Sequence, residues 1–442
     1  MHAHWQNHPH WNFAQTIPYR FAPTVQIETG IVSATSGTET ALSHRDFRRY
    51  LASVFLGILA IQIQSVAVSW QIYSIAHSPM ALGYVGLSQF VPMMACTLPA
   101  GHLADSFDRR LILAASYLAE AVAAALFVIL ALTAPSVAWP FYIALALFGA
   151  ARAFAGPAAQ SFVPMLVPAD QFPQAVAWSS STFSVAVIAG PALGGAIYIL
   201  GASVAYAVCL VLFVSIAIIT MSIQSRSTGY PTETDLTVLE RLTAGIAYVW
   251  SRPLILGSFS LDLFAVLLGG ATALLPIYAR DILHVGPLGL GLLRSAPALG
   301  AAILGFALGK MALQRNVGLW MFACVAIYGI ATIVFGLSRN FAISMAALFV
   351  LGASDMVSVY VRTTLTQLAT PDAMRGRVSA INRLFVGASN ELGEFESGLT
   401  ATLFGTVPSV VLGGVGTLAI VAIWALLFPS LREVDRLSDV TP

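Results

Sequence analysis

Residues 80–133 read MALGYVGLSQFVPMMACTLPAGHLADSFDRRLILAASYLAEAVAAALFVILALT, two long apolar runs joined by the polar segment GHLADSFDRR at 101–110. A helix needs roughly 20 predominantly apolar residues to cross about 30 Å of hydrocarbon. The runs at 80–101 and 110–133 both reach that length. This part of the chain therefore predicts an all-helical membrane protein that crosses the bilayer more than once.

The composition of the whole chain supports the same class. Of the 442 residues, 58% are hydrophobic and only 9% are charged, and the mean hydropathy is +0.82. Soluble domains carry about 25% charged residues, so lipid must be the main solvent of this chain. The net charge of +1 predicts no nucleic-acid partner. Cys96, Cys209 and Cys324 lie within apolar runs, so we expect buried thiols and no metal or cofactor.

Apolar runs of spanning length occur twelve times along the chain. Their approximate limits are 50–75, 80–101, 110–133, 138–161, 178–200, 203–223, 253–279, 288–309, 317–337, 341–364, 380–405 and 408–428. The eleventh run is the least apolar, because it contains Glu391, Glu394 and Glu396. We predict twelve transmembrane helices in two pseudo-symmetric bundles of six.

The basic residues predict the orientation of these helices. Between residues 45 and 436, fifteen Lys and Arg residues fall on the side shared by both termini, whereas the opposite loops hold only Arg280 and Arg339. Loops on the cytoplasmic side carry the excess of Lys and Arg in membrane proteins. Both termini should therefore be cytoplasmic. The fifteen are Arg45, Arg48, Arg49, Arg109, Arg110, Arg226, Arg241, Arg252, Lys310, Arg315, Arg375, Arg377, Arg383, Arg432 and Arg436.

The spans and polar segments divide the chain into five parts. The parts are a disordered cytoplasmic tail at 1–44, a six-helix bundle at 45–224, a cytoplasmic linker at 225–252, a second six-helix bundle at 253–429 and a C-terminal tail at 430–442. Apolar residues recur at helical spacing between Val238 and Trp250, which predicts an amphipathic helix within the linker.

An internal repeat supports the division into two bundles. One set of residues recurs at an offset of 208: Pro79, Gly83 and Gly101 match Pro287, Gly291 and Gly309. A second set recurs at an offset of 203: Pro168, Gly190 and Gly195 match Pro371, Gly393 and Gly398. Transporters built from such repeats bind substrate near the bilayer midplane, between the halves.

The segment 101–110 resembles the signature loop of the major facilitator superfamily, whose pattern is roughly G-x-L-a-D-r-x-G-r-[KR]. The match includes Gly101, Asp105, Arg109 and Arg110 and departs at Asp108, where the family has Gly. We expect Gly101 to permit close helix approach and Asp105 to face one of the arginines. The resemblance implies a latch that also engages the cytoplasmic end of the eleventh span. The alternative is a loop that contributes only topogenic charge.

The fourth span carries Arg152 and Gly156, which resemble the R-x-x-x-G motif of proton-coupled members of the superfamily. An arginine at this depth costs about 2.5 to 3.5 kcal/mol to insert, so it needs water or a partner. Helical rise places Glu120 of the third span at a similar depth. The two residues could form a coupling site for protons, or an ion pair that is only structural.

The fifth span contains Gly190, Pro191, Gly194 and Gly195, which resemble the G-P-x-x-G-G antiporter motif found mostly in exporters. Small residues let membrane helices pack closely, and a proline frees backbone groups at which a helix can bend. Gly and Pro are also frequent in membrane helices of any function. The motif favours export over uptake.

The second half adds four acidic residues within its spans, Asp262, Asp355, Glu391 and Glu394, together with Arg294. Buried acids without a partner can bind protons, so these four and Glu120 are the candidate proton carriers or substrate ligands. Asp262 and Glu394 are the first choices. Arg362, at the end of the tenth span, is expected to extend its charge to the membrane surface.

Two further stretches, 261–276 and 375–398, resemble the branch of the superfamily that contains the bacterial enterobactin exporter and related multidrug effluxers. The resemblance implies a proton-driven exporter of a small siderophore-like or drug-like amphipathic molecule. We expect a monomer in the bacterial inner membrane.

Other functions remain open at this stage. An uptake permease or a lipid flippase could share the fold, and a membrane sensor or scaffold would transport nothing. The motifs G-x-x-x-x-G-K-[ST], H-E-x-x-H and G-x-S-x-G are absent from the sequence. We therefore expect no enzyme activity.

Overall fold

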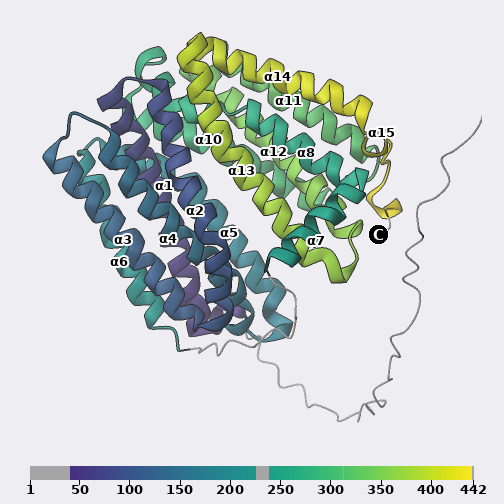
Figure 1. Ribbon diagram of the computed structural model, residues 1–442, viewed down its shortest axis with the longest axis horizontal. Coiled ribbons are helices and arrows are strands. Elements are labelled where there is room, and N and C mark those ends of the chain that lie inside the picture. The colour runs from purple at the N-terminus through teal and green to yellow at the C-terminus, as the bar shows by residue number, and fades with distance from the viewer. Residues whose placement is uncertain (1–39, 225–237, 312, 441–442) are drawn as a thin grey trace, which may run out of the picture. The chain divides into compact units, whose positions relative to one another are not determined.

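The computed structural model describes residues 40–224, 238–311 and 313–440, and every regular element within these ranges is a helix. The predicted tail as far as residue 39 and the predicted linker from 225 to 237 lie outside the described residues. In Figure 1 the first bundle comprises α1 (Arg45–Ala76), α2 (Pro79–Ser106), α3 (Arg109–Thr133), α4 (Trp139–Phe162), α5 (Phe172–Tyr198) and α6 (Ala202–Met221).

The second bundle follows α7 (Val238–Ser251) in the chain. It comprises α8 (Pro253–Leu268), α9 (Leu275–Ile277), α10 (Gly286–Lys310), α11 (Val317–Leu337), α12 (Phe341–Leu368), α13 (Asp372–Phe404) and α14 (Thr406–Leu427). The short helix α15 (Pro429–Arg432) comes after it. The predicted all-helical membrane fold is confirmed, because eleven helical segments of the described chain are long and apolar enough to cross a bilayer.

One further long helix, α13, is not among the eleven segments that are long and apolar enough to cross a bilayer. Its 33 residues would span roughly 50 Å at 1.5 Å per residue. Its sequence contains both the basic cluster near its start and three glutamates in its second half. Charged residues in a membrane helix face the bundle interior or a water-filled cavity, so α13 is the helix most expected to line a polar site.

Helix α8 does not continue through the span predicted at 253–279. It ends at Leu268, and Gly269 and Gly270 lead into the 3₁₀ helix η4 (Ala271–Leu274), then α9 and the π-helix η5 (Tyr278–Ile282). A Cβ on Gly270 would lie 2.8 Å from the Gly393 carbonyl oxygen, a backbone atom of α13, so only glycine allows this approach. The Ser397 hydroxyl donates to the carbonyl oxygen of Gly270 (3.0 Å). This hydrogen bond replaces one that the interrupted helix does not make.

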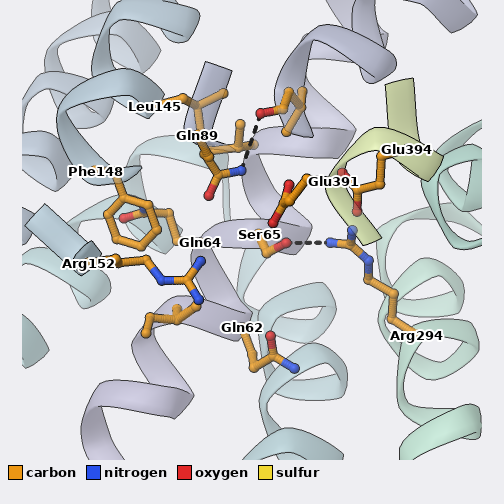
Figure 2. Close-up of a pocket in the computed structure, with 13 residues that line it drawn as sticks. Gln62, Gln64, Ser65, Gln89, Leu145, Phe148, Arg152, Arg294, Glu391 and Glu394 are labelled. Atoms are coloured by element: carbon orange, nitrogen blue, oxygen red, sulfur yellow. Dashed lines mark hydrogen bonds between the residues drawn. The ribbon is translucent and has the colours of Figure 1, made fainter. Parts of the chain in front are cut away.

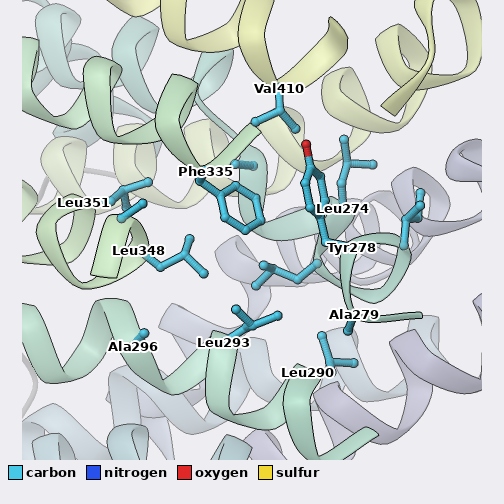
Figure 3. Packing of buried hydrophobic residues seen from close by; sticks show 14 of the residues in the cluster. Leu274, Tyr278, Ala279, Leu290, Leu293, Ala296, Phe335, Leu348, Leu351 and Val410 are labelled. Carbon is cyan, nitrogen blue, oxygen red and sulfur yellow. The ribbon is translucent and has the colours of Figure 1, made fainter. Parts of the chain in front are cut away.

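Each bundle packs mainly on itself, and two helix pairs provide nearly all contact between the bundles: α2 with α13, and α5 with α10. We call the end of the bundles where α1 begins and α14 ends the terminal end, and the opposite end the distal end. A buried apolar cluster crosses between the bundles near the distal end, where the Tyr278 and Phe335 rings lie 4.4 Å apart (Figure 3). Tyr278 Oη also donates to the Gly336 carbonyl oxygen (2.8 Å).

The helix α7 packs against the start of α13. Gly245 lies close to α13, since a Cβ there would lie 3.1 Å from Ile381 Cγ1. Tyr248 Oη donates to the carbonyl oxygen of Ala369 (3.1 Å), which fixes the other end of α7. These contacts hold α7 on the second bundle at its terminal end.

Candidate functional site

A cavity of about 130 Å³ lies between the two bundles (Figure 2). Both bundles contribute polar side chains to it, and predicted site residues Arg152, Glu391 and Glu394 all line its wall. The complete lining is Ile61, Gln62, Gln64, Ser65, Val68, Val85, Gln89, Leu145, Phe148, Arg152, Arg294, Glu391 and Glu394. The structure thus gathers residues from α1, α2, α4, α10 and α13 around one polar space.

The two glutamates of the cavity approach α2 at a glycine. A Cβ on Gly86 would lie 2.8 Å from Glu394 Oε2 and 3.1 Å from Glu391 Oε2. Both carboxylates therefore occupy the space that any other residue at position 86 would fill. Because α2 and α13 belong to different bundles, the charge state of these carboxylates bears directly on a contact between the bundles.

Arg294 connects the second bundle to the first from the other side of the cavity. Its Nη1 donates to Ser65 Oγ on α1 (2.7 Å), and its charge faces those of Glu394 and Glu391 (Figure 2). These four side chains come from three helices, α1, α10 and α13. This arrangement gives Arg294 both a hydrogen-bond acceptor and two counter-charges within the cavity.

Arg152 reaches the cavity from α4, across from Arg294 (Figure 2). Its guanidinium carbon lies 5.8 Å from the centroid of the Phe148 ring, within the range of a cation–π contact. Among the described residues it forms no ion pair within 4.0 Å and no hydrogen bond. The donors of Arg152 are therefore open to water or to a ligand.

Glu120 lies outside the cavity wall, although the sequence placed it beside Arg152. Its side chain is buried and Oε2 accepts no hydrogen bond in the described part of the chain. Arg152 is the cation that acts on it electrostatically, but the two form no ion pair within 4.0 Å among the described residues. The expected pair is not formed in this conformation.

Asp262 and Arg362 form an ion pair inside the second bundle, between α8 and α12. The expectation that Arg362 extends to the membrane surface is wrong, because its side chain is only 4% exposed and that of Asp262 only 7%. Sequence reasoning failed here because Asp262 and Arg362 are 100 positions apart, and no spacing rule brings them together. Asp355 lies two turns from Arg362 on the same face of α12. The Ser358 hydroxyl between them has no hydrogen-bond partner among the described residues.

This buried ion pair gives a stability prediction. Arg362→Met leaves the Asp262 carboxylate buried without its cation, and breaking a buried pair this way costs about 3 to 5 kcal/mol. The double variant Asp262→Leu, Arg362→Met buries no charge and should recover most of the loss. The midpoint of thermal unfolding of the purified proteins in detergent measures both effects. A double variant less stable than Arg362→Met would contradict a purely structural role.

The signature loop holds its own bundle together in this conformation. Asp108 caps α3 by accepting a hydrogen bond from the Arg110 backbone N–H (3.0 Å), which explains why an acid can stand where the family has Gly. Arg110 Nη1 donates to the Ile223 carbonyl oxygen (2.9 Å) and Arg109 Nη1 to Met165 Sδ (3.1 Å). The Asp105 side chain lies outside the described residues.

The expected close helix approach at Gly101 stays a prediction. No described atom lies within 4 Å of the position that a Cβ on Gly101 would take. The same is true at Gly309, which matches Gly101 in the repeat, and at Gly376 on α13. All three lie near the terminal end, where the described residues form no glycine crossing between the bundles like those at the distal end.

The antiporter-like motif lies at two close helix crossings. A Cβ on Gly190 would lie 2.5 Å from Gln62 Cβ, and one on Gly194 would lie 2.9 Å from Ile63 Cα, both on α1. A Cβ on Gly195 would lie 2.4 Å from the carbonyl oxygen of Pro287, on α10 of the other bundle. Real Cβ atoms do not occupy such positions, so these glycines permit the crossings.

The repeat residues form the matching contact on the other side of the molecule. A Cβ on Gly398 would lie 2.9 Å from the carbonyl oxygen of Pro79. Pro79 and Gly398 match Pro287 and Gly195 by the same offsets of 208 and 203. The α2–α13 and α5–α10 crossings are thus pseudo-equivalent, and both close the bundles against each other near the distal end.

A polar contact lies beside these crossings at the distal end. Tyr73 Oη on α1 donates to the Asp281 carboxylate of the π-helix η5. The Arg280 guanidinium carbon lies 6.0 Å from the centroid of the same tyrosine ring. The sequence alone did not identify Tyr73 or Asp281 as partners. Both are polar residues at the ends of apolar runs, which is the signal that could have found them. Irregular helical turns such as π-helices often mark functional positions.

Sequence reasoning also missed the glutamines of the cavity. Gln62 and Gln64 interrupt the first apolar run and Gln89 the second, and polar residues in a span normally face the bundle interior. This signal was present in the sequence. Gly86 carried no signal, because a glycine in a membrane helix is common and only the fold places two carboxylates against it.

The chain matches known transporters along nearly all its length. A family model described as transmembrane secretion effector matches residues 36–441. The chain is 26% identical over 395 residues to the enterobactin exporter EntS of Citrobacter koseri, covering 88% of this chain and 94% of that protein. The EntS protein of Escherichia coli O157:H7 matches at the same identity and coverage.

Solved structures show the same fold at low sequence identity. A bacterial homolog of the human lysosomal transporter Spinster, in an inward-facing and unoccupied conformation, is 14% identical and has a TM-score of 0.68. That comparison covers 90% of this chain and 97% of that one. The nucleoside transporter NupG is 11% identical with a TM-score of 0.70, covering 87% of this chain and 100% of that one.

Proposed function

The chain belongs to the transmembrane secretion effector family of major facilitator transporters, and on that premise we propose that it exports a small molecule in exchange for protons. It is a membrane transporter and not an enzyme. The observation that carries the proposal is the cavity between the bundles, where Glu391 and Glu394 lie against the α2 backbone and face Arg294. Export as the direction is supported by the names of the curated relatives.

The contacts at the distal end support transport by alternating access. The crossings at Gly195 and Gly398 and the Tyr73–Asp281 contact join the bundles at that end. Gly101, Gly309 and Gly376 have no described atom within 4 Å of a Cβ position at the terminal end. The excess of basic residues supports a cytoplasmic position for the terminal end. The cavity is then reached from the cytoplasm, where an exporter collects its substrate.

The proton step is assigned to the α13 carboxylates. A proton carrier must be charged in one conformation and neutral in another, and a group at a contact between bundles changes its surroundings when that contact opens. Glu391 and Glu394 lie at such a contact, between α2 and α13. Asp262 keeps Arg362 as its counter-ion within one bundle, and Glu120 and Asp355 lie away from the cavity wall. These three acids have supporting roles in the proposal.

The remaining candidate residues support the movement of the bundles. Asp105, Arg109 and Arg110 act as a latch at the terminal end when it closes, and Gly190, Pro191, Gly194 and Gly195 let α5 pivot on α1 and α10. The substrate is proposed to be a compact siderophore-like or drug-like molecule, carried by a monomer in the bacterial inner membrane with both termini cytoplasmic.

Transport into proteoliposomes of chosen lumen pH tests the proposed function. The purified protein would be reconstituted, and a panel of labelled small molecules that includes enterobactin would be added outside. An antiporter accumulates its substrate in a lumen more acidic than the medium, because protons leave as the substrate enters. A protonophore should abolish the accumulation. Accumulation only in an alkaline lumen would overturn export by antiport and indicate proton-driven uptake.

A further inference from the structure

We propose that the substrate of this transporter is amphoteric, with an anionic or acceptor group that binds Arg152 and a cationic or hydrogen-bond-donor group that binds Glu391 and Glu394. The inference rests on the proposed proton antiport for one of its steps. It goes beyond that proposal by assigning each end of the substrate to one bundle.

The anionic end is assigned from the unequal environments of the two arginines in the cavity. Arg294 donates to Ser65 Oγ (2.7 Å) and faces both glutamates. Arg152 contacts the Phe148 ring, and its charge acts on Glu391 and Glu120 only from beyond ion-pair distance. Among the described residues it forms neither an ion pair within 4.0 Å nor a hydrogen bond, so its donors are unoccupied there. A guanidinium presents five donors in a planar fork that matches a carboxylate or phosphate group. Arg152 is therefore the open anion position.

The cationic or donor end of the substrate is assigned to Glu391 and Glu394. Two arguments support this: the hydrogen-bonding chemistry of carboxylates, and the competition between substrate and protons that antiport requires. An ionised carboxylate only accepts hydrogen bonds, so Glu391 and Glu394 select an ammonium or a group rich in O–H or N–H donors. In an antiporter the substrate must compete with protons for the site. A purely anionic substrate binds best when the glutamates are protonated and would move together with protons. A donor end at the glutamates gives the required competition.

A buried amide supports binding of a polar ligand between these ends. Gln64 is 2% exposed, and its Oε1 has no hydrogen-bond partner among the described residues although it lines the cavity. An unpaired buried acceptor is costly, and a donor on the substrate would satisfy it. The cavity of about 130 Å³ is smaller than the roughly 300 to 1,000 Å³ of drug-sized sites. It fits the compact polar part of a substrate.

The two ends of such a substrate would join the two bundles. Arg152 belongs to α4 in the first bundle, and Glu391 and Glu394 belong to α13 in the second. A molecule with only one charged end satisfies one bundle and leaves the other charge open. An amphoteric molecule gains both contacts at once, so its binding favours closure of the bundles around it.

Three probes of similar size test whether both ends of the substrate contribute to binding. They are 4-(aminomethyl)benzoate, which is amphoteric, its cationic methyl ester, and anionic 4-methylbenzoate. Calorimetric titration at pH 7 into the full-length protein in lipid nanodiscs should give a dissociation constant for the amphoteric probe at least about tenfold lower than for either other probe, a difference of about 1.4 kcal/mol. Equal affinities for the three probes, or no binding of any of them, would overturn the proposal.

Charge variants assign the ends to residues. Arg152→Gln should weaken the amphoteric and anionic probes and leave the ester unchanged, while the double variant Glu391→Gln, Glu394→Gln should weaken the amphoteric probe and the ester. Arg152→Lys keeps the charge and should retain part of the preference, which separates lost recognition from misfolding. An unchanged preference in Arg152→Gln would refute the assignment of the anionic end.

The binding test and the transport test can fail separately. The titrations need no proton gradient. If the three probes bind as expected but no substrate accumulates in response to a pH gradient, the proposed antiport is refuted and the two binding positions stand. If another compound accumulates in response to a pH gradient and the three probes bind equally, the proposed export stands and the proposal of an amphoteric substrate is refuted.

Discussion

Glu394→Gln should abolish proton-driven accumulation of substrate while leaving exchange of labelled for unlabelled substrate measurable. Glutamine keeps nearly the shape of glutamate beside Gly86 but cannot bind and release a proton. The bundles can then still alternate with substrate bound, yet no proton completes the cycle. We expect accumulation in an acidic lumen to fall to the level of liposomes without protein. Glu391→Gln should behave in the same way.

The matched control for these variants is Glu396→Gln, on the same helix. Glu396 does not line the cavity, so its replacement changes the charge of α13 without changing the site. This control should accumulate substrate at the wild-type rate. If Glu394→Gln and Glu391→Gln each still accumulate substrate in an acidic lumen, neither residue alone couples protons, and Glu120 with Arg152 becomes the better candidate.

Gly195→Leu should shift the protein away from the conformation with a closed distal end. A Cβ at residue 195 would lie 2.4 Å from the Pro287 carbonyl oxygen, a backbone atom that no rotamer change can move. Overpacking costs about 1 to 3 kcal/mol, which changes the ratio of two conformations by about 5- to 150-fold. Labelling of a single cysteine at Val68, in the cavity wall, should become faster from the distal side.

The control for this variant is Gly309→Leu on α10, where no described atom lies within 4 Å of the Cβ position. Both variants add the same side chain to a membrane helix, but only one lies in a crossing between the bundles. Cys96, Cys209 and Cys324 would first be replaced so that only the introduced thiol reacts. Equal labelling in Gly195→Leu and Gly309→Leu would show that the crossing does not control access.

Much of the fold could be predicted from the sequence, because apolar runs and basic loops report directly on lipid and topology. The matched glycines at offsets of 208 and 203 also appear in pseudo-equivalent crossings, Pro79 with Gly398 and Pro287 with Gly195. The break after Leu268 was not predicted, since the run from 253 to 279 stays apolar through the break. Hydropathy does not report whether an apolar segment remains a regular helix.

The candidate site could be predicted only in part. A charged residue in a span signals an interior position, and this signal alone identifies Arg152, Glu391 and Glu394 as candidate site residues. Pairing depends on distances between residues far apart in the sequence. Asp262 and Arg362 therefore could not be matched, and Gly86 could not be assigned its place beside two carboxylates.

The central claim is that substrate and protons move in opposite directions through the cavity. The most direct measurement is the pH of the lumen, reported by a trapped dye in proteoliposomes with an acidic interior, as substrate is added outside. The wild-type protein should make the lumen more alkaline as substrate enters, and the double variant Glu391→Gln, Glu394→Gln should not. Entry of substrate with no change in lumen pH, or with acidification of the lumen, would contradict proton antiport.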